Sequence, residues 1–265
     1  MIVVIKGAGD LASGTALRLS HAGFSILMTE TAAPTTLRRT VAFSRAVYEG
    51  RTRVEDIDAV LVKDDDEIRA AFERRQIAVL IDPAATVVRR LRPGALVDAI
   101  MAKKNTGTSI DDAPVVVGLG PGFTAALDCH AVIETMRGHT LGRVLTQGSA
   151  LPDTGVPGVI GGFTTERLLR AGTDGLFEAL AEIGDTIQKG SLAARVRKPD
   201  GGTVPIRAEI DGVLRGLLPS GTVVTKGMKS GDIDPRCERF HCFTVSDKAL
   251  AIAGGVLEAI LRFSR

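Results

Sequence analysis

A glycine-rich turn near the N-terminus carries the clearest chemical pattern in the chain. Gly7-Ala8-Gly9-Asp10-Leu11-Ala12 fits the G-x-G-x-x-A form of the dinucleotide fingerprint, in which backbone N–H groups at a helix start bind phosphate. Glu30 lies 21 residues beyond Gly9, where an acid that accepts a ribose hydroxyl is expected. A turn of this shape without a ligand is the alternative. The pattern predicts a site for a nucleotide or other phosphorylated ligand that includes Gly7, Gly9, Asp10, Ala12 and Glu30.

The segments around this turn supply the context that the fingerprint needs. Ile2 to Ile5 form a continuous apolar run, which is typical of a parallel strand that is covered on both faces. Apolar and small residues then recur at helical spacing from Leu11 to Ala22, and Gly23 ends the expected helix. A second strand follows and closes at Glu30. The order of strand, turn, helix and strand therefore favours a Rossmann-like start.

Further strands are expected at residues 59–62, 77–81, 95–97 and 115–117, and they alternate with helical patterns such as 65–75. That alternation predicts a mostly parallel sheet, whose ligands bind beyond the carboxyl ends of the strands. The polar residues that follow these strands are candidate site residues, and Lys103 with Asn105 would orient the far end of the ligand. Asp82 could instead cap a helix, and Lys103 could simply be solvated. The candidates are Asp82, Asp98, Lys103 and Asn105.

A second glycine-rich turn follows the expected strand at residues 115–117, and a helix is expected over residues 125–136. The backbone N–H groups of Gly118, Gly120 and Gly122 could form a second anion cradle, although a purely structural turn fits as well. Arg38 and Arg39 follow the second strand. They could bind further phosphate groups or coat a helix with charge.

The cysteine and histidine residues predict no metal site. Cys129 adjoins His130, but the spacing matches no zinc pattern, and adjacent helical residues point about 100° apart. A thiolate that acts on a bound cofactor and a buried inert thiol both stay open for Cys129, and equally for Cys242 beside His241. No catalytic residue is identified, and whether the chain is an enzyme stays open.

Composition excludes several classes of partner. The net charge is +2, Trp is absent and Tyr48 is the one tyrosine, so nucleic-acid binding is not expected. The chain starts on a core strand rather than a basic leader, and its longest apolar stretch, residues 249–261, is too short to span a membrane. Three dispersed cysteines suit a reducing compartment. We therefore expect a cytoplasmic protein without nucleic-acid or membrane partners; a homo-oligomer is not excluded.

The second half has a different character and contains an internal repeat. The pattern G-x-x-[IV]-x-K-G occurs at residues 184–190 and again at residues 221–227. Short strands follow each copy, which resembles the barrel-sandwich hybrid of biotinyl and lipoyl carrier domains. No Met-Lys-Met context surrounds Lys198, so covalent loading is not expected. We predict a Rossmann-like domain over residues 1–154, then a barrel-sandwich-hybrid-like β domain over residues 155–265 with a C-terminal helix that packs on either domain.

Several segments together resemble the YqeB-like family from end to end. They are residues 5–14, 38–44, 118–123, 137–139 and 242–248. That family is associated with selenium-dependent molybdenum hydroxylases, so the resemblance implies an accessory factor in their maturation. It implies a molybdopterin-type or nucleotide ligand and an apo molybdenum hydroxylase as partner.

Two other functions are alternatives to this role in hydroxylase maturation. Glu30 without a following arginine favours NAD over NADP in a dehydrogenase, but no residue identifies itself as a hydride-transfer acid. A scaffold that recruits the apo-hydroxylase would need no ligand.

Overall fold

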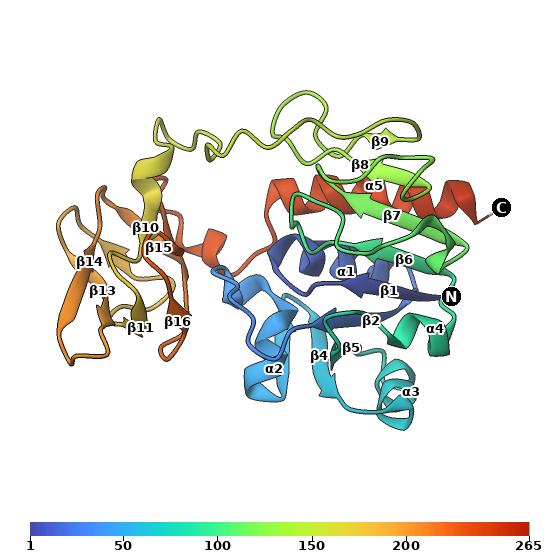
Figure 1. The fold of residues 1–265 in the computed structure, drawn as a ribbon, viewed down its shortest axis with the longest axis horizontal. Helices are drawn as coiled ribbons and strands as arrows, with labels where there is room; N and C mark the ends of the chain where they lie inside the picture. Colours follow the sequence, from blue (N-terminus) through green and yellow to red (C-terminus); the bar gives the residue numbers. More distant parts are fainter. Residues whose placement is uncertain (265) are drawn as a thin grey trace. The chain divides into compact units, whose positions relative to one another are not determined.

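The computed structural model describes residues 1–264 and divides the chain into two compact units (Figure 1). The first unit comprises Met1–Pro34, Val41–Thr154 and the C-terminal segment from Val245. The second unit comprises Thr35–Thr40 and Gly155–Thr244. The chain therefore enters the second unit twice and ends in the first.

The first unit is built around a nine-stranded sheet in the order β3-β4-β5-β2-β1-β6-β7-β8-β9. The inner strands pair in parallel, whereas β3 pairs antiparallel with β4 and β9 pairs antiparallel with β8. The strands are β1 (Ile2–Lys6), β2 (Ser25–Glu30), β3 (Arg51–Val54), β4 (Ile57–Val62), β5 (Ile77–Ile81), β6 (Ala95–Asp98), β7 (Val115–Leu119), β8 (Ala131–Ile133) and β9 (Val144–Leu145).

Helices cover both faces of this sheet. Successive residues of β1 point to opposite faces, so Val3 and Ile5 join one apolar core while Val4 joins another. The first core includes α1 (Asp10–His21) and α5 (Asp247–Phe263), and the second includes α3 (Asp65–Glu73) and α4 (Val87–Leu91). The remaining helices of the unit are α2 (Ala46–Glu49) and the short 3-10 turns η2 (Phe43–Arg45) and η3 (Ile110–Asp112). The 3-10 turn η1 (Arg39–Val41) lies where the chain passes from the second unit back to the first.

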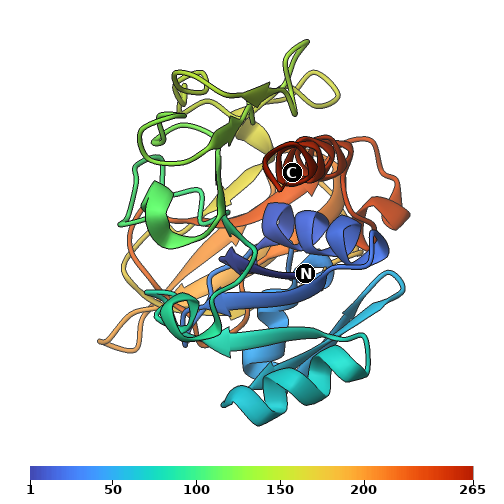
Figure 2. The same cartoon turned by 90° about the vertical axis from the view of Figure 1, so that its right-hand side faces the viewer.

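Close packing of α1 against α5 ties the end of the chain to its beginning, and Figure 2 shows the two helices side by side. A Cβ atom on Gly14 would lie 2.7 Å from the Ala249 Cβ and 2.9 Å from Val245 Cγ1, so only glycine allows this approach. No helix in the described part of the chain is long and apolar enough to cross a bilayer.

The topology corrects the predicted Rossmann-like class. In the dinucleotide-binding fold the third parallel strand lies beside the second. Here β5 lies between β2 and β4, and both edge strands run antiparallel, so the sheet is mixed. The predicted helix over residues 125–136 is also wrong. Asp128 accepts a hydrogen bond from the Thr124 N–H at 2.7 Å in a tight turn, and the β-branched residues of β8 then enter the sheet.

The second unit contains two four-stranded antiparallel sheets in the orders β10-β17-β15-β12 and β14-β13-β11-β16. Their strands are β10 (Leu168–Arg170), β11 (Gly175–Ala179), β12 (Thr186–Ile187), β13 (Leu192–Arg197), β14 (Thr203–Arg207), β15 (Gly212–Leu217), β16 (Val223–Val224) and β17 (Lys229–Asp234). Two 3-10 turns, η4 (Thr165–Arg167) and η5 (Arg239–Cys242), complete it.

This unit departs from the predicted barrel-sandwich-hybrid domain that follows the first domain. Leu37, from the N-terminal half of the chain, accepts a hydrogen bond from the Leu217 N–H at 2.9 Å. Leu37 also packs against the unit's apolar core, while the predicted C-terminal helix belongs to the first unit. A Rossmann-like domain followed by a separate C-terminal domain therefore does not describe the molecule.

Candidate functional site

The first glycine turn brings five predicted site residues together at the carboxyl end of β1. Gly7 has φ +89°, and a Cβ there would lie 3.2 Å from the Ala99 carbonyl oxygen, so this position requires glycine. Gly9 precedes α1, Asp10 is its first residue, and Ala12 is buried. The Glu30 carboxylate accepts hydrogen bonds from the N–H groups of Ala8 at 3.0 Å and Thr31 at 2.8 Å. One N–H of the turn is therefore already bound by a protein carboxylate.

A buried ion pair lies where β1 and the neighbouring β6 end. The Lys6 ammonium lies 3.2 Å from the Asp98 carboxylate and donates to the Thr108 hydroxyl at 2.7 Å. Thr108 in turn donates to Asp98 at 2.6 Å, and Asp98 also accepts from the Ile100 N–H at 3.2 Å. All three side chains of this group are buried. Because an ammonium has three donors, Lys6 keeps one N–H for another acceptor.

The predicted residues Lys103 and Asn105 make contacts within their own surroundings. Asn105 accepts from the N–H groups of Gly107 and Thr108 and donates to the Thr108 carbonyl, which shapes the loop that carries Thr108. Lys103 is exposed, and its ammonium lies 2.6 Å from the Asp153 carboxylate. Asn105 therefore stabilises the loop that places the Thr108 hydroxyl beside the buried Lys6–Asp98 ion pair.

The second glycine turn is explained by packing. A Cβ on Gly118 would lie 2.5 Å from the Phe123 ring, and one on Gly120 would lie 2.6 Å from the Thr135 hydroxyl. A Cβ on Gly122 would lie 2.6 Å from the Lys104 backbone. Protein atoms thus fill the space beside each of these three glycines.

The side chains of the other candidates are held by contacts of their own. The Asp82 carboxylate accepts from the Val87 N–H at 2.8 Å and the Thr86 hydroxyl at 3.1 Å, so it caps α4. Arg38 and Arg39 belong to the second unit, where Arg38 donates to the carbonyls of His241 and Thr244 and Arg39 to that of Leu217.

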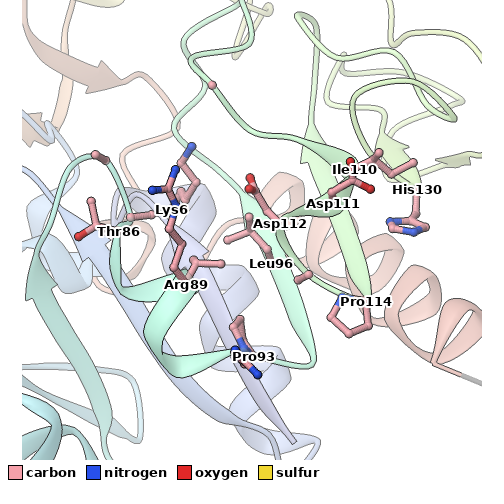
Figure 3. Close-up of a pocket in the computed structure, with 16 residues that line it drawn as sticks. Lys6, Thr86, Arg89, Pro93, Leu96, Ile110, Asp111, Asp112, Pro114 and His130 are labelled. Carbon is pink, nitrogen blue, oxygen red and sulfur yellow. The ribbon is translucent and has the colours of Figure 1, made fainter.

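A pocket of about 940 Å³ opens between α4 and the segment that contains η3, and Lys6 lies on its wall. Figure 3 shows Thr86 and Arg89 on one side, Ile110 and Asp111 on the other, and Leu96 of β6 between them. Arg92, Asp112 and His130 also line it. This volume lies within the range of about 300–1,000 Å³ that is usual for small-molecule sites.

Hydrogen bonding fixes the ring of His130 at the edge of this pocket. Its Nδ1 accepts from the Val116 N–H at 3.0 Å, so the neutral ring carries its proton on Nε2 and presents a donor. The neighbouring Cys129 is buried, and burial raises the pKa of its thiol to about 11. Burial likewise raises the pKa of the Cys242 thiol. Neither thiol has the thiolate character that nucleophilic attack needs.

Among residues 1–264, no three His, Cys, Asp or Glu side chains gather in a way that could hold a metal ion.

Sequence patterns alone do not indicate Lys6, Arg89, Arg92, Asp111 or Thr108 as site residues. A signal for Lys6 exists, because a lysine that ends an otherwise apolar strand must find a partner when it is buried. The arginines and Asp111 give no such signal, since charged residues of this kind usually lie on solvated surfaces.

No family model matches the chain. "Uncharacterized protein YqeB" from Escherichia coli (strain K12) is 50% identical over 260 residues, which is 98% of this chain and 47% of that protein. This similarity supports the resemblance to the YqeB-like family that the sequence motifs indicate. The chain spans about half the length of this relative, whose name gives no link to molybdenum hydroxylases.

Solved structures show weaker likeness. The apo ectoine utilization protein EutE (DoeB) from Ruegeria pomeroyi is 15% identical with a TM-score of 0.30, covering 88% of this chain and 85% of that one. A succinylglutamate desuccinylase/aspartoacylase from Rhodobacter sphaeroides is 12% identical with a TM-score of 0.30, covering 88% and 84%. Scores this low transfer neither activity nor substrate to this chain.

The predicted function finds no support in the fold or in these comparisons. The predicted maturation factor would bind a phosphorylated pterin or nucleotide in a Rossmann-like cleft, and the mixed sheet of the first unit does not have the strand order of that fold. The name of the YqeB relative does not support a role in molybdenum cofactor maturation either, so the prediction is not kept. The NAD-dependent oxidoreductase and the scaffold for an apo-hydroxylase have no support either.

Proposed function

We propose that the first unit binds a small molecule that carries both a carboxylate and an ammonium group, such as an amino acid, in the pocket between α4 and η3. The observation that carries this proposal is the arrangement of charge in the pocket. Arg89 and Arg92 lie on the α4 side and Asp111 on the η3 side. A zwitterionic ligand would neutralise both sides at once.

The arginines of α4 differ in their partners. Arg90 binds the Asp65 carboxylate at 2.7 Å and does not line the pocket. Arg89 and Arg92 line it, and within residues 1–264 neither forms an ion pair. A guanidinium matches the planar geometry of a carboxylate and binds it through two parallel hydrogen bonds. These two side chains are thus available to an anionic ligand group.

Two further polar side chains of the pocket, those of Lys6 and Asp111, would also bind the ligand. Lys6, held by Asp98 and Thr108, offers its third N–H to a ligand acceptor. Asp111 donates its backbone N–H to the Ser109 hydroxyl at 3.3 Å in the η3 cap. Within residues 1–264 its carboxylate has no partner, so it can accept from a ligand ammonium. Leu96 and Val88 give the pocket an apolar surface for the ligand's carbon chain.

Isothermal titration with glutamate, its N-acetyl derivative and glutarate tests the proposal. We expect glutamate to bind most tightly, because the other two lack the ammonium that Asp111 would accept. Arg89→Gln should weaken glutamate binding by about tenfold to a hundredfold, the worth of a hydrogen bond to a charged group. Arg90→Gln is the matched control and should leave affinity unchanged.

Absence of saturable binding for all three compounds would refute the proposal, as would equal affinities of the Arg89→Gln and Arg90→Gln variants. The cytoplasmic location expected from the sequence remains a prediction.

A further inference from the structure

His130 lines the pocket, but recognition of a zwitterion gives it no role. Its backbone N–H donates to the Val116 carbonyl at 2.8 Å, and its ring Nδ1 accepts from the N–H of the same residue at 3.0 Å. Val116 is a fully buried residue of β7, and His130 directly precedes β8. The ring therefore supplies the acceptor for a buried backbone donor where the pairing of β7 with β8 begins.

Two contacts hold this ring in one orientation. Rotation of the ring would leave the Val116 N–H without its acceptor, which is costly for a buried donor. The Phe263 ring also packs against it, with the ring centroids 5.7 Å apart and the planes tilted by 57°. A proton on Nδ1 would face the Val116 N–H, so the ring carries its proton on Nε2. His130 thus presents a neutral N–H donor in a fixed place.

The Nε2 donor is available to an acceptor from outside the protein. Within residues 1–264 it forms no hydrogen bond, and it is not among the buried polar atoms of this part of the chain that lack a partner. Figure 3 shows His130 on the same side of the pocket as Ile110 and Asp111, across from Arg89. A carboxylate or amide oxygen of a ligand can accept from such a donor. A ligand without that oxygen leaves the donor unpaired and binds less tightly.

We propose that His130 determines which amino acid the pocket takes, by donating its Nε2–H to an oxygen on the ligand's side chain. This inference rests on the proposed function, in which Arg89 and Asp111 bind the carboxylate and the ammonium that all amino acids share. Those two groups alone do not distinguish one amino acid from another. The donor of His130 selects side chains that end in an amide or a carboxylate, and it disfavours aliphatic side chains of the same length.

Isothermal titration with glutamine and norvaline tests this inference, because norvaline has a methyl group where glutamine has its side-chain amide. His130→Asn removes Nε2, whereas the side-chain oxygen of asparagine lies about where Nδ1 lies and can still accept from the Val116 N–H. We expect the wild type to prefer glutamine. In the variant the ratio of the two Kd values should fall by about threefold to tenfold, the worth of one neutral hydrogen bond. Glutamate, titrated in parallel, distinguishes a side-chain carboxylate from an amide, and its advantage over norvaline should fall in the same variant.

A second variant separates selectivity from a structural role. In His130→Gln the amide nitrogen reaches about where Nε2 lies, but the Val116 N–H loses its acceptor. This variant should unfold at a lower temperature than His130→Asn and yet keep more of the preference for glutamine.

Equal affinity of the wild type for glutamine and norvaline would overturn the inference without any variant. An unchanged ratio of Kd values in His130→Asn, while Arg89→Gln still weakens the binding of both amino acids, would also overturn it and leave the proposed function intact. Absence of saturable binding of any of these amino acids to the wild type would overturn both.

Discussion

The two units bury charged side chains in different ways. In the first unit Lys6 and Asp98 form one pair at 3.2 Å beside a pocket. In the second unit Asp232 accepts from both Arg167 and Arg215 at 2.5 Å. Arg215 also lies 3.2 Å from Asp234, which binds Arg236 as well at 2.7 Å.

This difference distinguishes a candidate binding site from an ion-pair network that has only a structural role. In the second unit each acid is shared by two arginines, and the carboxylate oxygens that face the network are occupied. In the first unit Lys6 retains a donor that lies on a pocket wall. Buried charge alone therefore does not identify a binding site. An unsatisfied donor or acceptor that reaches a cavity is the better indicator.

The largest effect is expected from Asp232→Ala. It removes the carboxylate that Arg167 and Arg215 share and leaves two buried guanidinium groups without it. Breaking a buried ion pair costs about 3–5 kcal/mol, and we expect at least that loss in the free energy of unfolding. Urea denaturation would measure it. Asp200→Ala, which breaks the exposed pair with Lys198, is the control and should cost less than about 1 kcal/mol. Similar losses in both variants would show that the network contributes no more than a surface pair.

Lys6→Met breaks the buried ion pair of the first unit, which lies at the candidate binding pocket. The buried Asp98 carboxylate keeps the Thr108 hydroxyl and the Ile100 N–H, so the loss of stability should be smaller, about 3 kcal/mol. Glutamate binding should weaken in the same variant. In the double variant Lys6→Met/Asp98→Asn the unpaired charge is gone, so stability should largely return while binding stays weak. Full affinity in the double variant would remove Lys6 from the site.

The two glycine turns show what the sequence could and could not predict. The strand before the first turn, the helix after it and the strand that closes at Glu30 are confirmed. The second turn follows a confirmed strand, yet the expected helix is absent. Local patterns were the same at both turns. The outcome at the second turn depends on long-range contacts, since β8 pairs with β7 and Phe123 packs against Gly118.

Local sequence patterns also could not predict the order of the strands in the sheet or the partners of the charged side chains. The position of β5 between β2 and β4 depends on how helices pack on the sheet, which no single segment specifies. Arg38 and Arg39 had the chemistry of phosphate ligands, but their donors bind backbone carbonyls of the second unit. The three arginines of α4 and its C-cap illustrate the same limit, because Arg89 and Arg90 are adjacent and, within residues 1–264, only Arg90 forms an ion pair.

Acid pH should weaken the second unit through Asp234. Burial opposes ionisation of this carboxyl, but hydrogen bonds from Arg236 and the charge of Arg215 outweigh it and lower its pKa to about 2. Because the folded pKa lies below the unfolded value of 3.8, this stabilisation is complete above about pH 4 and disappears as pH falls toward 2. We expect a loss on the order of 1–2 kcal/mol over that window, after allowance for solvent near Arg236. Arg236→Gln should flatten this dependence in urea unfolding, whereas Lys198→Gln should not.

Lys248→Met gives the smallest expected effect and compares Lys248 directly with Lys6. Met removes a charge that burial, Arg137 and the start of α5 disfavour, so the variant should be more stable than the wild type at pH 7. The gain should be about 0.3–1 kcal/mol, the usual cost of a cation at a helix N-terminus. Since the folded pKa is lowered, the wild-type penalty is present at low pH and is relieved as pH rises toward the ordinary value of 10.5. The advantage of the variant in thermal unfolding should therefore shrink between neutral and alkaline pH. A loss of stability comparable to that of Lys6→Met would mean that Lys248 is a paired structural lysine, and the contrast between the two would fail.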